Sequence, residues 1–388
     1  MSIRERLHAH ADGAWRDPRA VAASWVGADG IDERLLRHRT RGRFWETLAA
    51  TGTTLLVTRE YEHLLVALHA GRRGPVVSYL PLPHPSGIAV DRRRGVVHVA
   101  STRNPNQVHD LVPAVAAPPV VGARAERLAG RPLVPVRTRV LPGGTYLHDL
   151  ALVGGRLHGN AVGRNAVVRI DDDGTATPVW WPRCVERRGR PRLDRNYLQL
   201  NSIAAGRTVR GSYFSASTDA IGRLRPGHLD FPVDRRGVVF SGATREPVVR
   251  GLTRPHSARL RRGALWVDDS GYGEVGTCRD GRFEAIARPG GWTRGLGFSG
   301  GVAWVGTSRV LTRFRQYAPG LDPDRCICGV HAIDARSGRV LGSLVWPLGN
   351  QVFAVEPVPA TWTSGLPIVA GRREPAREQG LFYGFVTE

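Results

Sequence analysis

Lysine is absent from this chain of 388 residues, so all 55 basic residues are arginine. They outnumber the 34 acidic residues and give a formal net charge of +21. With 47 glycines and 27 prolines, this composition is typical of the codon usage of a GC-rich genome. The arginines are scattered over turns and are not gathered on one helix face. We therefore expect no nucleic-acid partner, whereas an anionic small-molecule or peptide substrate, or a protein partner, suits the positive field.

Long apolar runs are also missing. No uninterrupted apolar stretch reaches about 18 residues, so the sequence predicts no transmembrane helix and no membrane partner. The segment Met1–Arg6 lacks the apolar core of a secretion signal. We therefore expect a cytoplasmic protein.

Cysteine is scarce, and the four cysteines are expected to be reduced in the cytoplasm. Cys326 and Cys328 lie two residues apart and would share one face of a strand. Such a pair is half of the ligand set of a zinc site, but no second pair lies nearby in the sequence. The role of this pair stays open.

A short pattern recurs six times: an apolar pair or triplet followed by small or polar residues. Before every copy except the first lies a second short strand and a glycine-containing turn, which is typical of a β-hairpin. Three or four antiparallel strands per repeat make a propeller blade, and radial repetition lets one closed domain reach this length. The copies begin at Leu55, Val97, Leu157, Tyr213, Leu265 and Ala303.

The two ends of the chain complete each other in this pattern. The first copy has no leading strand, and Val352–Val355 near the C-terminus has no hairpin partner. Pairing them closes the ring and removes the exposed edges of an open sheet. We therefore predict an all-β fold, a six-bladed β-propeller in which N-terminal strands pair with a C-terminal inner strand. The alternative is a β-sandwich with a second domain, which needs neither a missing nor a spare strand.

Residues 1–44 fall outside the repeats and are predicted to form a short, partly helical N-terminal extension. The propeller is predicted over residues 45–388. The stretches Pro113–Pro142 and Glu186–Asn196 are predicted to be long loops, which commonly carry lids and specificity elements. The six blades are predicted at about 84–143, 147–199, 200–253, 255–291, 293–347, and 348–388 with 45–82.

The first residues of the inner strands should converge on one opening of the central channel. When the strands are aligned on their apolar residues, the position two residues before the first core residue is polar in every blade. A wet channel explains such polarity, and so does a binding site on the axis. The six residues are Ser86, His148, Asn201, His256, Arg294 and Gln351.

Histidines are prominent among these axial residues. His84 lies two residues before Ser86, so strand alternation points both side chains the same way. His84, His148 and His256 are then a candidate three-imidazole site for a divalent transition metal (Zn, Fe or Cu), with positions open to water or substrate. Asp149 is a candidate carboxylate behind the metal ligands.

The remaining axial residues suggest how a substrate would be held. Arg294 would orient a carboxylate or oxyanion, and Asn201 and Gln351 would position it. Two alternatives stay open beside the metal site: an axial site that binds without metal, and a channel that is merely hydrated.

Several strings in the chain carry a family resemblance. They are Leu56–His63, Pro255–Ser257, Leu265–Gly271 and Thr293–Leu296. On these strings the chain resembles an uncharacterised bacterial family of propeller-like proteins, classified as a domain of unknown function. The resemblance covers nearly the whole chain and implies the fold, without a reaction.

A more distant resemblance lies in His84–Asp91 and Pro255–Ser257, which are similar to NHL-repeat blades. NHL-repeat propellers include peptidyl-α-hydroxyglycine amidating lyase, a six-bladed propeller with three axial histidines on zinc. This resemblance implies a metal on His84, His148 and His256, although His84 stands outside the strict register.

Two functions follow from the sequence. The first is a metal-dependent propeller enzyme that acts on a small acidic or peptide-derived substrate at the axis, by lyase, hydrolase or oxidative chemistry. The alternative is a non-catalytic propeller that binds a peptide or protein partner over one face.

Overall fold

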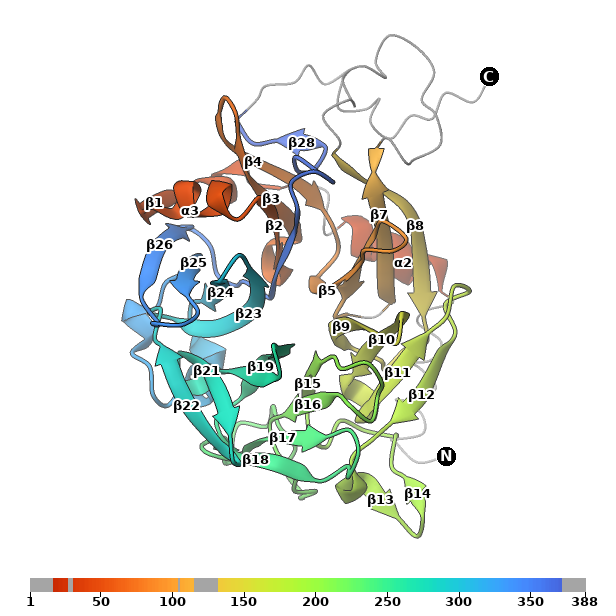
Figure 1. Cartoon of the computed structure of the whole chain (residues 1–388). Helices are drawn as coiled ribbons and strands as arrows, with labels where there is room; N and C mark the ends of the chain where they lie inside the picture. The colour runs from red at the N-terminus through yellow and green to blue at the C-terminus, as the bar shows by residue number, and fades with distance from the viewer. Residues whose placement is uncertain (1–16, 27–30, 104, 115–131, 372–388) are drawn as a thin grey trace.

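Six antiparallel sheets stand around a central axis (Figure 1). The computed structural model describes residues 17–26, 31–103, 105–114 and 132–371. Within each sheet the strands follow one another outward from the axis in nearly sequential order, as expected where short turns join antiparallel neighbours. The predicted all-β, six-bladed propeller is confirmed.

We number the blades from the one that contains both chain ends, and give the strands from the axis outward. Blade 1 consists of β27 (Ala354–Pro359), β2 (Thr53–Arg59), β3 (Leu64–Gly71), β4 (Gly74–Pro81) and β28 (Ile368–Val369). Blade 2 consists of β5 (Pro85–Asp91), β6 (Val96–Ser101), β7 (Asn106–Pro113) and β8 (Leu133–Leu141). Blade 3 consists of β9 (Leu147–Val153), β10 (Arg156–Ala161), β11 (Ala166–Ile170) and β12 (Ala176–Trp180).

The second half of the ring repeats this arrangement. Blade 4 consists of β15 (Leu200–Ala204), β16 (Tyr213–Ala216), β17 (Gly237–Ser241) and β18 (Pro247–Leu252). Blade 5 consists of β19 (Pro255–Arg261), β20 (Ala264–Asp269), β21 (Glu274–Arg279) and β22 (Arg282–Ala287). Blade 6 consists of β23 (Trp292–Ser299), β24 (Val302–Ser308), β25 (Gly329–Asp334), β26 (Val340–Val345) and, at its outer edge, β1 (Arg39–Gly42).

The ring closes as the sequence predicts. β27 from the C-terminal part is antiparallel to β2 from the N-terminal part, with Thr58 opposite Ala354 and Thr53 opposite Pro359. The paired strand begins at Ala354, two residues later than the segment picked from the sequence. Phe353 still donates its backbone N–H to the Thr58 carbonyl at 2.8 Å.

The segment before the first repeat is built into the ring's edge. The helix α2 (Pro18–Val26) and the 3-10 helix η1 (Glu33–Leu36) precede β1, which pairs with β26, and α3 (Phe44–Ala50) packs behind it. Strand β1 is therefore the fifth strand of blade 6, although residues 1–44 were expected to lie outside the ring. No helix within the described residues is long and apolar enough to cross a bilayer.

The two expected long loops contain regular structure. Residues 133–141 of the proline-rich stretch form β8, the outer strand of blade 2, whereas residues 115–131 lie outside the described part of the chain. The arginine-rich stretch forms a small hairpin of β13 (Glu186–Arg187) and β14 (Arg190–Pro191).

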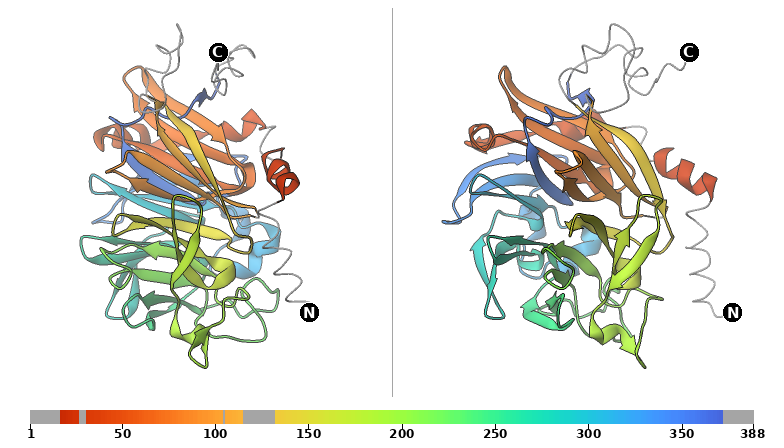
Figure 2. Two further views of the ribbon diagram at one scale, coloured as in Figure 1. Left: turned by 90° about the vertical axis from the view of Figure 1, so that its right-hand side faces the viewer. Right: turned by 45° about the vertical axis from the view of Figure 1, so that its right-hand side comes forward.

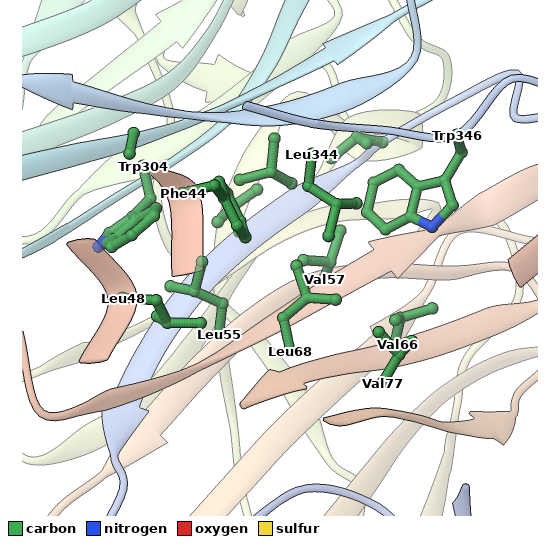
Figure 3. Packing of buried hydrophobic residues seen from close by; sticks show 14 of the residues in the cluster. Phe44, Leu48, Leu55, Val57, Val66, Leu68, Val77, Trp304, Leu344 and Trp346 are labelled. Atoms are coloured by element: carbon green, nitrogen blue, oxygen red, sulfur yellow. The ribbon is translucent and has the colours of Figure 1, made fainter. Parts of the chain in front are cut away.

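The core is divided among the gaps between neighbouring blades. Leu55 and Val57 of β2 point toward blade 6, whereas Leu56 between them packs toward blade 2. Figure 3 shows the first of these clusters, where Trp304 and Leu344 of blade 6 meet the strands of blade 1. Since every blade is covered on both faces, its strands are continuously apolar, which explains the repeated apolar pairs and triplets in the sequence.

Polar residues at the ends of these runs join each blade to the next. A side chain at or just after the end of the second strand donates a hydrogen bond to a backbone carbonyl at the start of the next inner strand. Between blades 2 and 3 the donor is Ser86 of the inner strand itself, to the Leu147 carbonyl at 2.9 Å. The others are Thr58 to Ser86 at 2.6 Å, Asn160 to Leu200 at 2.8 Å, Ser215 to Pro255 at 3.3 Å, Ser270 to Thr293 at 2.6 Å, and Ser308 to Val352 at 3.0 Å.

Thr58 gives a direct test of the closure. Its buried hydroxyl donates to the Ser86 carbonyl and accepts from the Ala354 N–H at 2.9 Å. Thr58→Val leaves both backbone groups without this partner, so we expect unfolding in urea to show a loss of about 2–4 kcal/mol. Thr277→Val is the control, because this half-buried hydroxyl makes no hydrogen bond within the described residues; its effect should stay within about 0.5 kcal/mol. Equal losses in the two variants would contradict the role of Thr58.

Candidate functional site

A bulge follows the start of the inner strands and aims the axial side chains. The register shifts between Pro85 and Ile88 in β5, between Leu200 and Ser202 in β15, and between His256 and Arg259 in β19. Bulges bend a strand and redirect a side chain. His256 stands at the edge of its shift and Asn201 inside its own, and both line the channel opening, which we call the mouth.

Four of the six aligned residues line one pocket on the axis. The pocket has a volume of about 10 Å³, which is room for roughly one water molecule. Its lining includes His148, Asn201, His256 and Arg294, each from a different blade, and Phe353 of the closing segment. The fold thus brings together four side chains that are distant in the sequence and that the alignment on apolar residues had placed at equivalent positions.

The other two aligned residues have different roles. Ser86 joins blades 2 and 3, as described above, and does not line the pocket. Gln351 links a cation and an anion at the mouth. With its amide oriented to satisfy both neighbours, its nitrogen donates to Glu60 Oε2 at 3.0 Å and its oxygen accepts from Arg294 Nη1 at 2.5 Å.

His148 and His256 face each other with ring centroids 6.3 Å apart. Burial lowers the pKa of both imidazoles well below the ordinary value, and the positive charge of Arg294 lowers both further. For His148, the neighbouring Asn201 amide partly opposes this shift. His256 Nδ1 lies 3.3 Å from the Arg254 carbonyl, so Nδ1 carries the proton and Nε2 keeps its lone pair. Both rings are neutral bases at pH 7.

Two buried guanidinium groups stand beside these imidazoles. Burial lowers the pKa of Arg294 and of Arg254 to about 10, so both remain charged at neutral pH. Each donates through Nη1, Arg294 to Gln351 and Arg254 to Gln199 Oε1 at 2.7 Å, but neither Nε–H has an acceptor among the described residues. Each guanidinium therefore keeps a buried donor free for a ligand.

One carboxylate, Glu60, partly balances these charges. Glu60 lies in the 3-10 helix η2 (Glu60–Glu62) of blade 1, accepts from the Thr102 hydroxyl at 2.7 Å and lies 3.4 Å from Arg103 Nε. No carboxylate in the described part of the chain forms an ion pair with Arg254. The mouth is therefore electropositive.

Asp149 lines the floor of the pocket and is engaged in structure. Its Oδ2 accepts from the Ile203 N–H at 3.0 Å and from Arg259 Nη1 at 2.7 Å. Its Oδ1 accepts from the Leu150 N–H at 3.1 Å. These bonds tie blades 3, 4 and 5 together, and the predicted role of Asp149 in chemistry stays a prediction.

His84 does not join the other two histidines. It has a φ of 44°, and β5 begins only at Pro85, so strand alternation does not extend back to His84. Its ring packs on His63 with centroids 4.3 Å apart, and its Nδ1 lies 4.0 Å from Glu60. No three or more His, Cys, Asp or Glu side chains in the described residues are arranged to hold a metal ion. The set His84, His148 and His256 does not fit one ion here.

Sequence reasoning missed Arg254, Trp292, Phe353 and Glu60. The first three carry a readable signal, because each lies two residues from an aligned position: Arg254 before His256, Trp292 before Arg294, and Phe353 after Gln351. The backward step of two that selected His84 also selects Arg254 and Trp292, and a forward step of two selects Phe353. Glu60 follows the second strand of blade 1; it lies in the string Leu56–His63 that carries the family resemblance, but that string did not mark it as a site residue.

Metal content tests the three-histidine hypothesis. Since only His148 and His256 come together, we expect protein purified without a His tag to hold less than about a tenth of an equivalent of Zn, Fe or Cu. Elemental analysis measures this directly. A stoichiometric metal that is lost in both His148→Ala and His84→Ala would contradict the geometry and restore the hypothesis.

The protonation of the two axial imidazoles gives a pH test. A folded-state pKa below the unfolded value of about 6.5 means that the fold favours the neutral ring. Its contribution to stability is therefore present above about pH 6.5 and is lost as the pH falls. We expect the ring resonances of His148 and His256, assigned by NMR with His148→Asn and His256→Asn, not to titrate between about pH 8 and 6. A normal titration near pH 6.5 would contradict the buried, cationic surroundings.

Comparison with solved structures supports the fold. The structure of a nidogen/laminin complex has a TM-score of 0.51 and 13% identity, covering 79% of this chain and 98% of that chain. Such an identity bears on the fold alone. A gluconolactonase from Xanthomonas campestris has a TM-score of 0.44 and 16% identity over 76% of this chain and 86% of its own. Virginiamycin B lyase from Staphylococcus aureus has a TM-score of 0.40 and 12% identity, covering 80% of this chain and 99% of that chain.

Sequence comparison reaches further than these weak structural likenesses. No curated protein matches the chain. The model of one family, described as a domain of unknown function (DUF4915), matches residues 42–365, which takes in every blade. The resemblance noted in the sequence is thereby confirmed, and the chain belongs to the DUF4915 family of propeller proteins.

Proposed function

We propose that the mouth binds a small organic anion and that His148 and His256 transfer a proton on it. The observation that carries this proposal is the pair of buried guanidiniums, Arg254 and Arg294, each with an Nε–H that has no acceptor among the described residues. A hydrogen bond that involves a charged group contributes about 1.5–3 kcal/mol, so a buried guanidinium N–H gains about this much from an acceptor. A carboxylate or another oxyanion supplies that partner.

The balance of charge favours an anion over a neutral ligand. The charges of Arg254 and Arg294 each lower the pKa of both imidazoles. Glu60 lies beside Arg103 and accepts from the Gln351 amide, which in turn accepts from Arg294. Glu60 thus faces three guanidiniums at the mouth, whereas Asp149, the carboxylate that lines the pocket, is paired with Arg259. A bound anion reduces this excess of positive charge where desolvation makes an unbalanced charge costly.

The imidazoles suit proton transfer in both directions. A neutral ring with a free lone pair accepts a proton from a bound substrate, and the two cations that lower its pKa make the resulting imidazolium a strong acid. The proton therefore returns easily to a product or leaving group. Reactions that begin by removing a proton next to a carboxylate, as in lyases and isomerases, need this behaviour, and Arg294 would stabilise the negative charge that develops.

Binding and proton transfer can be tested without knowing the reaction. We expect isothermal titration calorimetry with acetate, glycolate, pyruvate and succinate to find at least one ligand with a Kd below about 1 mM. Arg294→Gln should weaken it at least about tenfold, whereas Arg282→Gln, an exposed arginine of β22, should not change it.

The exchange of substrate protons in D2O then reports on the histidines. Wild-type protein should speed deuterium uptake at the methyl group of pyruvate, whose protons lie next to the keto carbonyl, measured by NMR. His148→Gln or His256→Gln should abolish this while keeping pyruvate binding within about threefold. Binding without exchange would favour the alternative, a propeller that binds an acidic peptide or protein partner without catalysis. Binding of no anion would refute the proposal.

A further inference from the structure

One loop crosses the mouth and carries an aromatic surface that the axial pocket does not use. This mouth loop, residues 309–328, joins β24 to β25 and contains the 3-10 helices η8 (Thr312–Tyr317) and η9 (Pro323–Arg325). Hydrogen bonds tie the loop to three other blades: the backbone N–H of Arg309 donates to Asn350, that of Gly320 donates to Gly271 at 3.0 Å, and the Gln316 side chain donates to His228. Figure 2 shows these blue turns on the same side of the disc as α2.

Phe314 is the centre of the aromatic surface. Its ring is 5.8 Å from Trp292, 5.5 Å from Tyr317 and 6.4 Å from Tyr61, measured between centroids, and it is nearly parallel to the two tyrosines. Phe314 and Tyr61 are half-buried, so part of each ring remains accessible. Trp292 links this surface to the pocket, since its indole lies 6.1 Å from His256.

Guanidinium groups lie against the rings of this surface and against Phe353 at the axis. The guanidinium carbon of exposed Arg313 is 4.7 Å from the Phe314 centroid, that of Arg254 is 4.1 Å from Tyr317, and that of Arg294 is 3.5 Å from Phe353. A guanidinium stacked on a ring keeps its N–H edge free for an anion. Guanidinium groups therefore lie on aromatic rings both in the mouth loop and at the axis.

A buried donor on this surface also lacks an acceptor. Trp292 is 3% exposed, and its indole N–H has no hydrogen-bond partner within the described residues. With the Nε–H groups of Arg254 and Arg294, it makes three such donors on neighbouring segments. Since Trp292 does not line the axial pocket, a ligand that reaches all three donors extends beyond the pocket.

We infer that the ligand of the mouth is an anion that carries a planar ring, and this rests on the proposed anion site. The pocket of about 10 Å³ cannot hold a six-membered ring, so the ring must lie outside it, against the half-buried Phe314 and Tyr61 of the aromatic surface. A planar ring stacks on these faces and on the guanidinium planes, whereas a saturated ring of similar size gains less.

Calorimetry with matched probes tests the planar ring. The probes are benzoate, cyclohexanecarboxylate, acetate and benzyl alcohol. We expect benzoate to bind about three- to tenfold more tightly than cyclohexanecarboxylate, which corresponds to one aromatic stacking contact. Phe314→Leu should remove this preference and leave cyclohexanecarboxylate within about twofold. Phe283→Leu, which changes a half-buried ring on the outer strand β22, should keep it.

The outcomes separate the two proposals. Equal binding of benzoate and cyclohexanecarboxylate by the wild type overturns the inference that the ligand carries a planar ring, and leaves the proposed anion site unaffected. Binding of benzyl alcohol as tight as that of benzoate shows that the charge contributes nothing, and overturns both. An unchanged benzoate preference in Phe314→Leu also overturns the planar-ring inference, provided that the thermal transition of the variant shows that it is folded. Failure of every carboxylate to bind refutes the anion site itself.

Discussion

The pairing of β27 with β2 is the constraint on which the rest of this molecule depends. It brings a strand near the C-terminus against one near the N-terminus, and the same junction supplies Gln351, Phe353 and Glu60 to the mouth. Without it, Arg294 would lose the Phe353 ring beneath it and the Gln351 amide that accepts from its Nη1, together with Glu60, to which that amide donates. The structural closure of the ring and the assembly of the candidate site are thus one event.

The repeating hydrogen bonds between blades explain how the axial residues are held in place. Each of them fixes the start of an inner strand to the blade before it, and the bulges that follow turn the next side chains inward. The axial positions are therefore rigidly spaced around the channel, as a preorganised site requires. Asp149 and Arg259 serve the same purpose below the pocket by linking three blades.

The electrostatics of the mouth follow from burial more than from net charge. Most of the 55 arginines are spread over the surface, where water screens them. Arg254 and Arg294 are different because both are almost completely buried, 3% and 5% exposed, beside neutral imidazoles. Two arginines in this position shape the chemistry of the site more than the overall charge of +21 does.

The sequence by itself determined the fold class, the number of blades and the closing pair of strands, because these depend on local periodicity and on a missing and a spare strand. It also placed His148, Asn201, His256 and Arg294 in one ring, since equal positions in equal blades converge on the axis. Only the tertiary structure separated His84 from the other histidines, because its left-handed backbone conformation lies before the strand and escapes the alternation rule. Only the tertiary structure added Glu60 and the mouth loop, because their positions depend on contacts between blades that no spacing in the sequence records.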